Sequence, residues 1–256
     1  MLSTERFQDR VEDYIRYRPS YPADVLNSVI ERCGLEPSSV IADLGSGTGL
    51  LAQLFLEFGC DVYGVEPNRA MREAAERMLA RFPRFHSVEG TAEATNLPHS
   101  SCDVVTCGQS FHWFDPGQSR EECRRVLRPA GWVVLVWNVR RAGATPFLDG
   151  YEKLLRRHAP EHEEIERNRY DTARFDRFYG PGKWDVLTFE HSQFFDYQGT
   201  LGRLRSSSYS PKPGSPGYHE MEQDLQRLFA ATAVHNKIAF LYDTKVYFGR
   251  PAPQRD

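Results

Sequence analysis

Short apolar runs alternate with amphipathic segments through the first half of the chain. Five runs have the length and composition of buried strands: SVIADL, DVYGVEP, FHSVEG, CDVVTCG and GWVVLVWNV. Several of the segments between them carry apolar residues at helical spacing: GLLAQLFLEFG, RAMREAAERMLARFP and GQSREECRRVLRPAG. An earlier helix is indicated by Val25, Leu26, Val29 and Ile30, and Gly34 closes it. Strands that alternate with helices in this way predict βαβ units and a parallel sheet.

The regular alternation stops near Asn138, and the second half of the chain is organised differently. Residues 143–182 are helical in pattern, charged and less periodic. Four segments follow in order: a sixth strand in WDVLTFEHSQFF, a loop in SSSYSPKPGSPG, an amphipathic helix in YHEMEQDLQRLFAATAV and a last strand in DTKVYFGR. A length of 256 residues suits one large α/β domain, or one domain with an inserted subdomain.

Composition narrows the class of protein. An apolar content of 40% is enough for a packed core, and a formal net charge of -3 favours neither a nucleic acid nor a membrane surface as partner. The five cysteines are scattered and form no C-x-x-C pair, so we expect reduced thiols in a cytoplasmic protein and no metal site. No apolar window approaches the ~18 residues of a membrane span, and the N-terminus lacks the apolar region of a signal peptide.

The stretch DLGSGTG, which begins at Asp43, follows the first predicted strand and opens a helix. Its G-x-G-x-G spacing is one residue shorter than the dinucleotide pattern G-x-G-x-x-G, and the G-K-[ST] of a P-loop is absent. The carboxylate of Asp43 would repel a pyrophosphate but would attract an ammonium group. S-adenosylmethionine carries an ammonium group and no phosphate, so the pattern favours this cofactor over NAD.

Two further acids lie at strand ends. Glu66 ends the second strand and can accept both ribose hydroxyls of an adenosine, although NAD proteins place an acid similarly. Asp103 stands at the beginning of the fourth strand, away from the expected ligand edge, so we expect a structural role for it.

Taken in order, the motifs resemble those of the class I S-adenosylmethionine-dependent methyltransferases, in particular the type 11 branch that includes trans-aconitate methyltransferase-like proteins. The stretches DLGSGTG, GVEPNRAM, GTAEATNLP, CDVVTCGQSFHWF and VLRPAGW are similar to successive motifs of that family. The resemblance covers roughly Tyr14 to Val139. It implies a doubly wound, Rossmann-like α/β fold with a seven-stranded, mostly parallel sheet, an antiparallel last strand and a helical cap.

The implied organisation is a single methyltransferase domain, residues 1–256. Residues 1–34 would form an N-terminal lid segment and helix, and residues 35–142 the cofactor-binding core. Residues 143–236 would hold the helical cap and sixth strand, and residues 237–256 the last strand and tail.

The resemblance also assigns residues to the cofactor S-adenosyl-L-methionine and its product S-adenosyl-L-homocysteine. The resemblance implies that Glu66 of the second motif meets the ribose and that Met71 lies near the adenine. It also implies that Ala92 and Glu93 of the third motif meet the adenine and that the fourth motif runs along the cofactor into the active site. The residues carried over to the cofactor are Asp43, Gly45, Ser46, Gly47, Gly49, Glu66, Pro67, Met71, Ala92, Glu93 and Gln109.

The N-terminal stretch YRPSYP is similar to a segment of this branch that closes over the cofactor. Arg18 can fork onto a carboxylate of the cofactor or of the substrate, and the alternative is a surface arginine. An aromatic face suits the sulfonium, for which we favour Tyr14, whereas Tyr21 is assigned to the substrate. His112 is a candidate general base or substrate contact, and Trp113 a candidate floor of the substrate pocket; both could instead line or pack the pocket without chemistry.

Methyl transfer needs aligned partners more than a catalytic base, because the cofactor carries the reactive group. We expect in-line transfer to a small-molecule acceptor, a small carboxylate or other modest metabolite, with O-methylation favoured, in a monomer or weak homodimer without nucleic acid or membrane. Arginines and tyrosines of the cap would select it: Arg140, Arg141, Tyr151, Tyr209 and Tyr218. The alternatives are an S-adenosylmethionine-binding regulatory protein without turnover and, least favoured, an NAD-dependent oxidoreductase.

Overall fold

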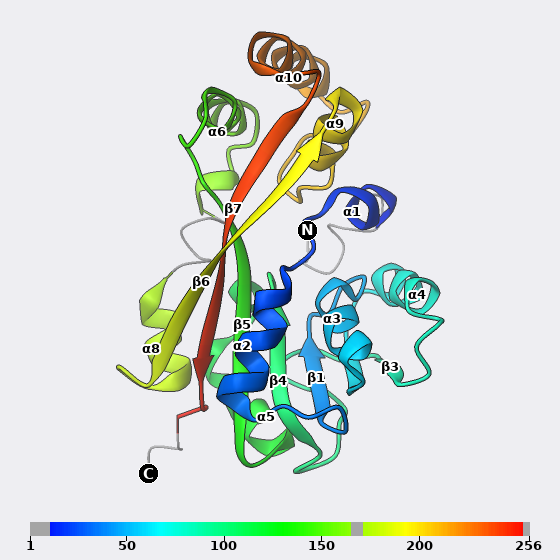
Figure 1. Ribbon diagram of the computed structural model, residues 1–256, viewed down its shortest axis with the longest axis vertical. Coiled ribbons are helices and arrows are strands. Elements are labelled where there is room, and N and C mark those ends of the chain that lie inside the picture. Colours follow the sequence, from blue (N-terminus) through cyan, green and yellow to red (C-terminus); the bar gives the residue numbers. More distant parts are fainter. Residues whose placement is uncertain (1–10, 165–170, 253–256) are drawn as a thin grey trace.

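One mixed sheet organises the molecule. The computed structural model describes residues 11–164 and 171–252. The strands run in the order β3-β2-β1-β4-β5-β7-β6. Strands β1 to β5 are parallel to one another, and β7 is antiparallel to both β5 and β6 (Figure 1). This confirms the predicted seven-stranded, mostly parallel sheet with an antiparallel last strand. The bounds are β1 (Val40–Leu44), β2 (Asp61–Val65), β3 (Phe85–Val88), β4 (Cys102–Gly108), β5 (Leu127–Arg140), β6 (Trp184–Phe195) and β7 (Ile238–Gly249).

Helices cover both faces of this sheet and form a group beyond its far end (Figure 1). Helices α2 and α3 pack on one face, and α5 and α8 on the other. Helices α6, α9 and α10 form the cap. The bounds are α1 (Val11–Tyr17), α2 (Ala23–Cys33), α3 (Leu50–Phe58), α4 (Arg69–Met78), α5 (Pro116–Val126), α6 (Pro146–His158), α8 (Thr172–Tyr179), α9 (Tyr197–Arg205) and α10 (Tyr218–Thr232). None of the helices in the described residues is long and apolar enough to cross a membrane.

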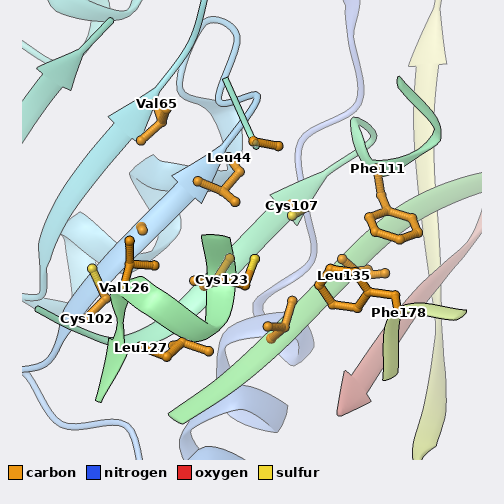
Figure 2. Packing of buried hydrophobic residues seen from close by; sticks show 14 of the residues in the cluster. Leu44, Val65, Cys102, Cys107, Phe111, Cys123, Val126, Leu127, Leu135 and Phe178 are labelled. Carbon is orange, nitrogen blue, oxygen red and sulfur yellow. The ribbon is translucent and has the colours of Figure 1, made fainter. Parts of the chain in front are cut away.

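The α5 side of the sheet is filled by a continuous apolar cluster. Figure 2 shows Cys123 and Val126 of α5 between Leu44 of β1 and Leu127 of β5, with Phe178 of α8 beside Leu135 of β5. Side chains of this size each contribute about 1.5–3 kcal/mol when fully buried. The cluster therefore anchors β1 and β4 rigidly, and these are the two strands whose carboxyl ends carry the glycine motif and the fourth motif.

The cap has its own apolar core built on the far half of β7. Tyr151 of α6, Leu204 of α9 and Leu225 of α10 pack together with Phe240 and Tyr242 of β7. Because β5, β6 and β7 continue beyond the rest of the sheet, they carry the cap directly (Figure 1). The cap is thus held in a fixed place over the carboxyl edge of the parallel strands.

Several element boundaries differ from the sequence-based prediction. The helix predicted to run on to Gly131 ends at Val126, because Leu127 is already extended and Pro129 cannot continue a helix. The stretch DTKVYFGR, predicted as the last strand within residues 237–256, covers only the second part of β7, which already begins at Ile238. Its additional residues pair with β6 and are buried partly under the cap, which short-range periodicity does not reveal.

The N-terminal segment is tied to both the core and the cap. Ile15 of α1 packs against Met71 of α4. The side-chain amide of Asn138 donates to the carbonyl of Ser20 at 3.0 Å, and the Arg18 guanidinium donates to the carbonyl of Ser206 at 2.7 Å. The segment therefore lies across the region between α4 and α9.

Candidate active site

The glycine loop between β1 and α3 takes a backbone path that requires glycine. Gly45, Gly47 and Gly49 have φ of 62°, 56° and 82°, which L side chains rarely adopt. A Cβ on Gly45 would also lie 2.7 Å from Cβ of Ser110, at the carboxyl end of β4. The loop therefore packs closely against the neighbouring strand end, at the edge where open α/β sheets bind ligands.

Asp43 lies at the end of β1, immediately before this loop, and is fully buried. The hydroxyl of Thr106 on β4 donates to Asp43 Oδ1 at 2.8 Å, whereas Oδ2 has no hydrogen-bond partner among the described residues. Burial raises the pKa of Asp43 to about 7, and the Thr106 hydrogen bond opposes this rise. A buried carboxylate oxygen without a donor suits the ammonium group of S-adenosylmethionine, so the donor set fits that cofactor.

Glu66 ends β2 and braces the glycine loop. Its Oε2 accepts from the backbone N–H of Gly47 at 3.0 Å, and its Oε1 from that of Asn68 at 2.9 Å. Burial raises the pKa of Glu66, whereas these two hydrogen bonds lower it. Glu66 thus holds the loop and also lines the cavity in which the ribose is expected.

Two adjoining cavities, each of about 170 Å³, lie along this edge. Both are lined by Gly45, Gly108 and Gln109, so they meet beside the glycine loop. The first cavity, on the Asp43 side, also contains these residues predicted for the site: Arg18, Tyr21, Asp43 and Ser46. The second cavity, on the Glu66 side, contains these: Gly47, Glu66, Pro67, Met71, Ala92, Glu93 and Trp113. An elongated ligand can therefore place one end in each cavity and pass the shared residues.

Gln109 lies where the two cavities meet and has an unusual backbone conformation. Its φ of 61° places a non-glycine residue in the left-handed region, directly after β4. The backbone N–H of Gln109 donates to the carbonyl of Val136 at 2.9 Å, which fixes this geometry. Strain of this kind, at a cavity junction, is typical of a ligand-contacting position.

The remaining predicted residues are placed unevenly. Glu93 accepts a hydrogen bond from the backbone N–H of Asp115 at 2.9 Å and still lines the second cavity. Trp113 lines the second cavity, beside Met71, and not the first. His112 is buried beside Trp113, and neither cavity has it among its lining residues. The structure therefore does not bring His112 and Tyr21 together, and the catalytic and substrate roles of His112 and Trp113 stay predictions.

Another predicted residue, Gly49, is not among the lining residues of either cavity. Gly49 caps α3, where a Cβ would collide with Leu79, so its conformation is needed for the turn. Tyr14 lies in α1, but its side chain is outside the described residues. Asp103, expected to be structural, accepts from the backbone N–H of Val40 at 2.8 Å and from Arg128 at 2.7 Å, which confirms that prediction.

Sequence reasoning missed several residues of the first cavity. Thr48 lines it with a buried hydroxyl that has no hydrogen-bond partner among the described residues. Arg203 and Tyr242 reach the first cavity from α9 and β7, which lie far along the chain from the motifs. Thr106 lies within the fourth motif, and only the pairing of β1 with β4 reveals that it contacts Asp43.

Comparisons with known proteins agree with this geometry. A family model described as a methyltransferase domain matches residues 42–135. A methyltransferase-like protein of Schizosaccharomyces pombe is 30% identical over 258 residues, which is 99% of this chain and 98% of that protein. A Mycobacterium tuberculosis methyltransferase is 37% identical over 134 residues, so that match spans 52% of the relative's length.

A solved structure has the same architecture. A candidate type II methyltransferase from Anaeromyxobacter dehalogenans superimposes with a TM-score of 0.67 at 25% identity, covering 93% of this chain and 100% of that one. All three comparisons indicate a methyltransferase. The buried Asp43 and the two adjoining cavities fit the cofactor of such an enzyme. The chain therefore belongs to the class I S-adenosylmethionine-dependent methyltransferases, and its cofactor is S-adenosylmethionine.

Proposed function

We propose that this methyltransferase acts on an oxygen of a small carboxylate. The observation that carries this proposal is the lining of the first cavity, where Arg18, Arg140 and Arg203 face a space that begins at Asp43. Guanidinium groups are the side chains best suited to carboxylates. The resemblance to trans-aconitate methyltransferase-like proteins supports the same class of acceptor.

The volume and position of the cavity support a small molecule in preference to a polymer. About 170 Å³ lies beside the glycine loop and the cap residue Tyr209, and the methionine end of the cofactor would occupy part of it. The cap residues Tyr209 and Tyr242 border this space, so a nucleic acid or protein side chain would have to pass them. A cytoplasmic location and a monomer or weak homodimer stay predictions from the sequence.

The chain's own residues bind, align and shield the reactants. When bound, S-adenosylmethionine supplies a methyl group already activated on a sulfonium, which leaves as a neutral thioether. Asp43 would hold the ammonium group of the cofactor and Glu66 its ribose, Gln109 borders both cavities, and Tyr209 and Tyr242 border the first cavity. A carboxylate acceptor is ionised at neutral pH, so this mechanism needs no general base. Proximity of this kind lowers a barrier by roughly 7–11 kcal/mol.

The proposal is tested by incubating the protein with methyl-labelled S-adenosylmethionine and either malonate, succinate and glutarate or their neutral diamides. We expect label transfer to one or more of the acids and none to the diamides. Label transfer to the diamides alone would contradict a carboxylate acceptor. Formation of S-adenosylhomocysteine, measured separately, distinguishes transfer from decay of the cofactor.

A further inference from the structure

Arg203 is a buried cation at the border of the first cavity. It lies in the last turn of α9, is 5% exposed, and lines the cavity together with Tyr209 and Tyr242. Its side chain forms three long hydrogen bonds, all to neutral hydroxyls. Nε donates to Tyr242 Oη at 3.2 Å, and Nη1 to Ser206 Oγ and Ser207 Oγ at 3.3 Å each.

The guanidinium lacks a carboxylate counter-ion within the described part of the chain. No ion pair joins Arg203 to an acidic side chain there, and Nη2 makes no hydrogen bond to a described residue. A buried charge is costly unless it is paired. The partial negative charge at the C-terminus of α9 offsets part of this cost, but it is weaker than a full counter-ion.

The two acids that line the same cavity in the described part of the chain, Glu152 and Asp43, do not pair with Arg203. Glu152 accepts from Arg140 at 3.1 Å and pairs with His162 Nε2 at 2.8 Å. Burial alone would raise the pKa of Glu152, but the His162 hydrogen bond and the Arg140 charge lower it to about 2. Asp43 lies at the glycine loop, where its free oxygen suits the cofactor. No acid that lines this cavity in the described part of the chain is therefore left to pair with Arg203, and a ligand could supply the anion.

We propose that Arg203 is the anchor for a carboxylate of the acceptor. Its unbonded Nη2 donates a hydrogen bond to that carboxylate, while the hydroxyls of Tyr242, Ser206 and Ser207 hold the guanidinium in place. This inference rests on the proposed function and adds the residue that selects the acceptor. Arg203 contacts the substrate and does not touch the methyl group. It explains why the chain keeps an otherwise uncompensated cation in the cap.

The test is calorimetric titration of malonate, succinate and glutarate into the protein saturated with S-adenosylhomocysteine. Three proteins are compared: wild type, Arg203→Gln and the control Arg205→Gln. Arg205 lies on the same helix but already pairs with Glu222 and does not line the cavity. We expect Arg203→Gln to weaken binding of the acid that the wild type binds best at least tenfold, and Arg205→Gln to change it less than twofold. Arg203→Lys keeps the charge without the planar fork, and we expect intermediate binding.

Unchanged S-adenosylhomocysteine affinity establishes that Arg203→Gln is folded, and Arg203→Lys supplies the comparison if the glutamine variant does not fold. Equal acid binding by wild type and the Arg203 variants would overturn the inference, as would a wild-type complex that binds none of the acids. Acid binding that depends on Arg203, without methylated product, would leave the anion site standing and contradict the proposed function. The two failures are therefore distinguishable.

Discussion

The hydroxyl of Thr106 donates a 2.8 Å hydrogen bond to one carboxylate oxygen of Asp43 and leaves the other oxygen without a partner among the described residues. The two residues are directly paired on adjacent strands, since Asp43 of β1 lies opposite Thr106 of β4. The hydrogen bond fixes the orientation of a fully buried acid. The remaining oxygen is thereby held at the wall of the first cavity, where it suits the cofactor ammonium.

Asp43→Asn should weaken S-adenosylmethionine binding at least tenfold, which corresponds to about 1.4 kcal/mol. The amide keeps the size of the side chain and can still accept from Thr106, but it loses the negative charge. Calorimetric titration with S-adenosylmethionine measures the change, and circular dichroism checks the fold. An unchanged dissociation constant would show that the Asp43 charge does not contact the cofactor.

The same carboxyl group should make the stability of the cofactor-free protein depend on pH. Burial raises its pKa from 3.8 to about 7, so the folded protein keeps a proton that the unfolded chain loses between about pH 4 and pH 7. Because the unfolded state binds fewer protons in that window, the free energy of unfolding falls as the pH rises. The Asp43→Asn variant has no titrating group at this position and should not show this decrease in the free energy of unfolding, which is at most roughly 4 kcal/mol. The free energies of unfolding of the variant and the wild type are measured in urea at pH 4 and pH 8. The variant should be more stable relative to wild type at pH 8 than at pH 4. An equal difference in stability at the two pH values would contradict the raised pKa of Asp43.

Gly202→Ala should loosen the N-terminal helix. A Cβ on Gly202 of α9 would collide with the ring of Tyr17 on α1. Since α1 also packs on α4 through Ile15 and Met71, we expect several-fold weaker S-adenosylhomocysteine binding and faster proteolysis near residues 17–22. The double variant with Tyr17→Ala removes the collision, so it should behave like Tyr17→Ala alone. Additive losses in the double variant would refute this contact.

Gln109→Gly should separate stability from binding. Relief of the left-handed backbone should raise the free energy of unfolding by up to about 1 kcal/mol. Loss of the side chain at the junction of the two cavities should lower S-adenosylmethionine affinity. Thermal unfolding and calorimetry measure the two effects on one sample. A variant that is less stable and binds normally would mean that the Gln109 backbone serves the fold alone.

The sequence predicted those parts of the site that follow directly from strand ends. Asp43 and Glu66 stand at the carboxyl ends of β1 and β2, so a parallel sheet places them at one edge whatever the rest of the chain does. The glycines after Asp43 were found from the same strand-to-helix context, whereas Ala92 and Glu93 of the third motif were assigned from the family resemblance. The parallel direction of the first five strands along the chain also follows from their regular alternation with helices.

The acceptor side of the site was not predictable in this way. Arg203 and Tyr242 reach the first cavity only because β7 inserts between β5 and β6 and carries the cap core. One arginine among many has no local pattern that separates it from surface arginines. Trp113, predicted as a floor of the substrate pocket, lines the second cavity, as Met71 does, and its substrate role stays a prediction.

The most direct test of methyl transfer to a carboxylate oxygen is the base lability of the product. After reaction with methyl-labelled S-adenosylmethionine and the preferred acid, the product is treated with mild alkali and the released label is collected as methanol. A methyl ester predicts nearly complete release of the transferred label as methanol. Label that stays on a base-stable product would place the methyl group on nitrogen, carbon or an ether oxygen and would contradict the proposed reaction.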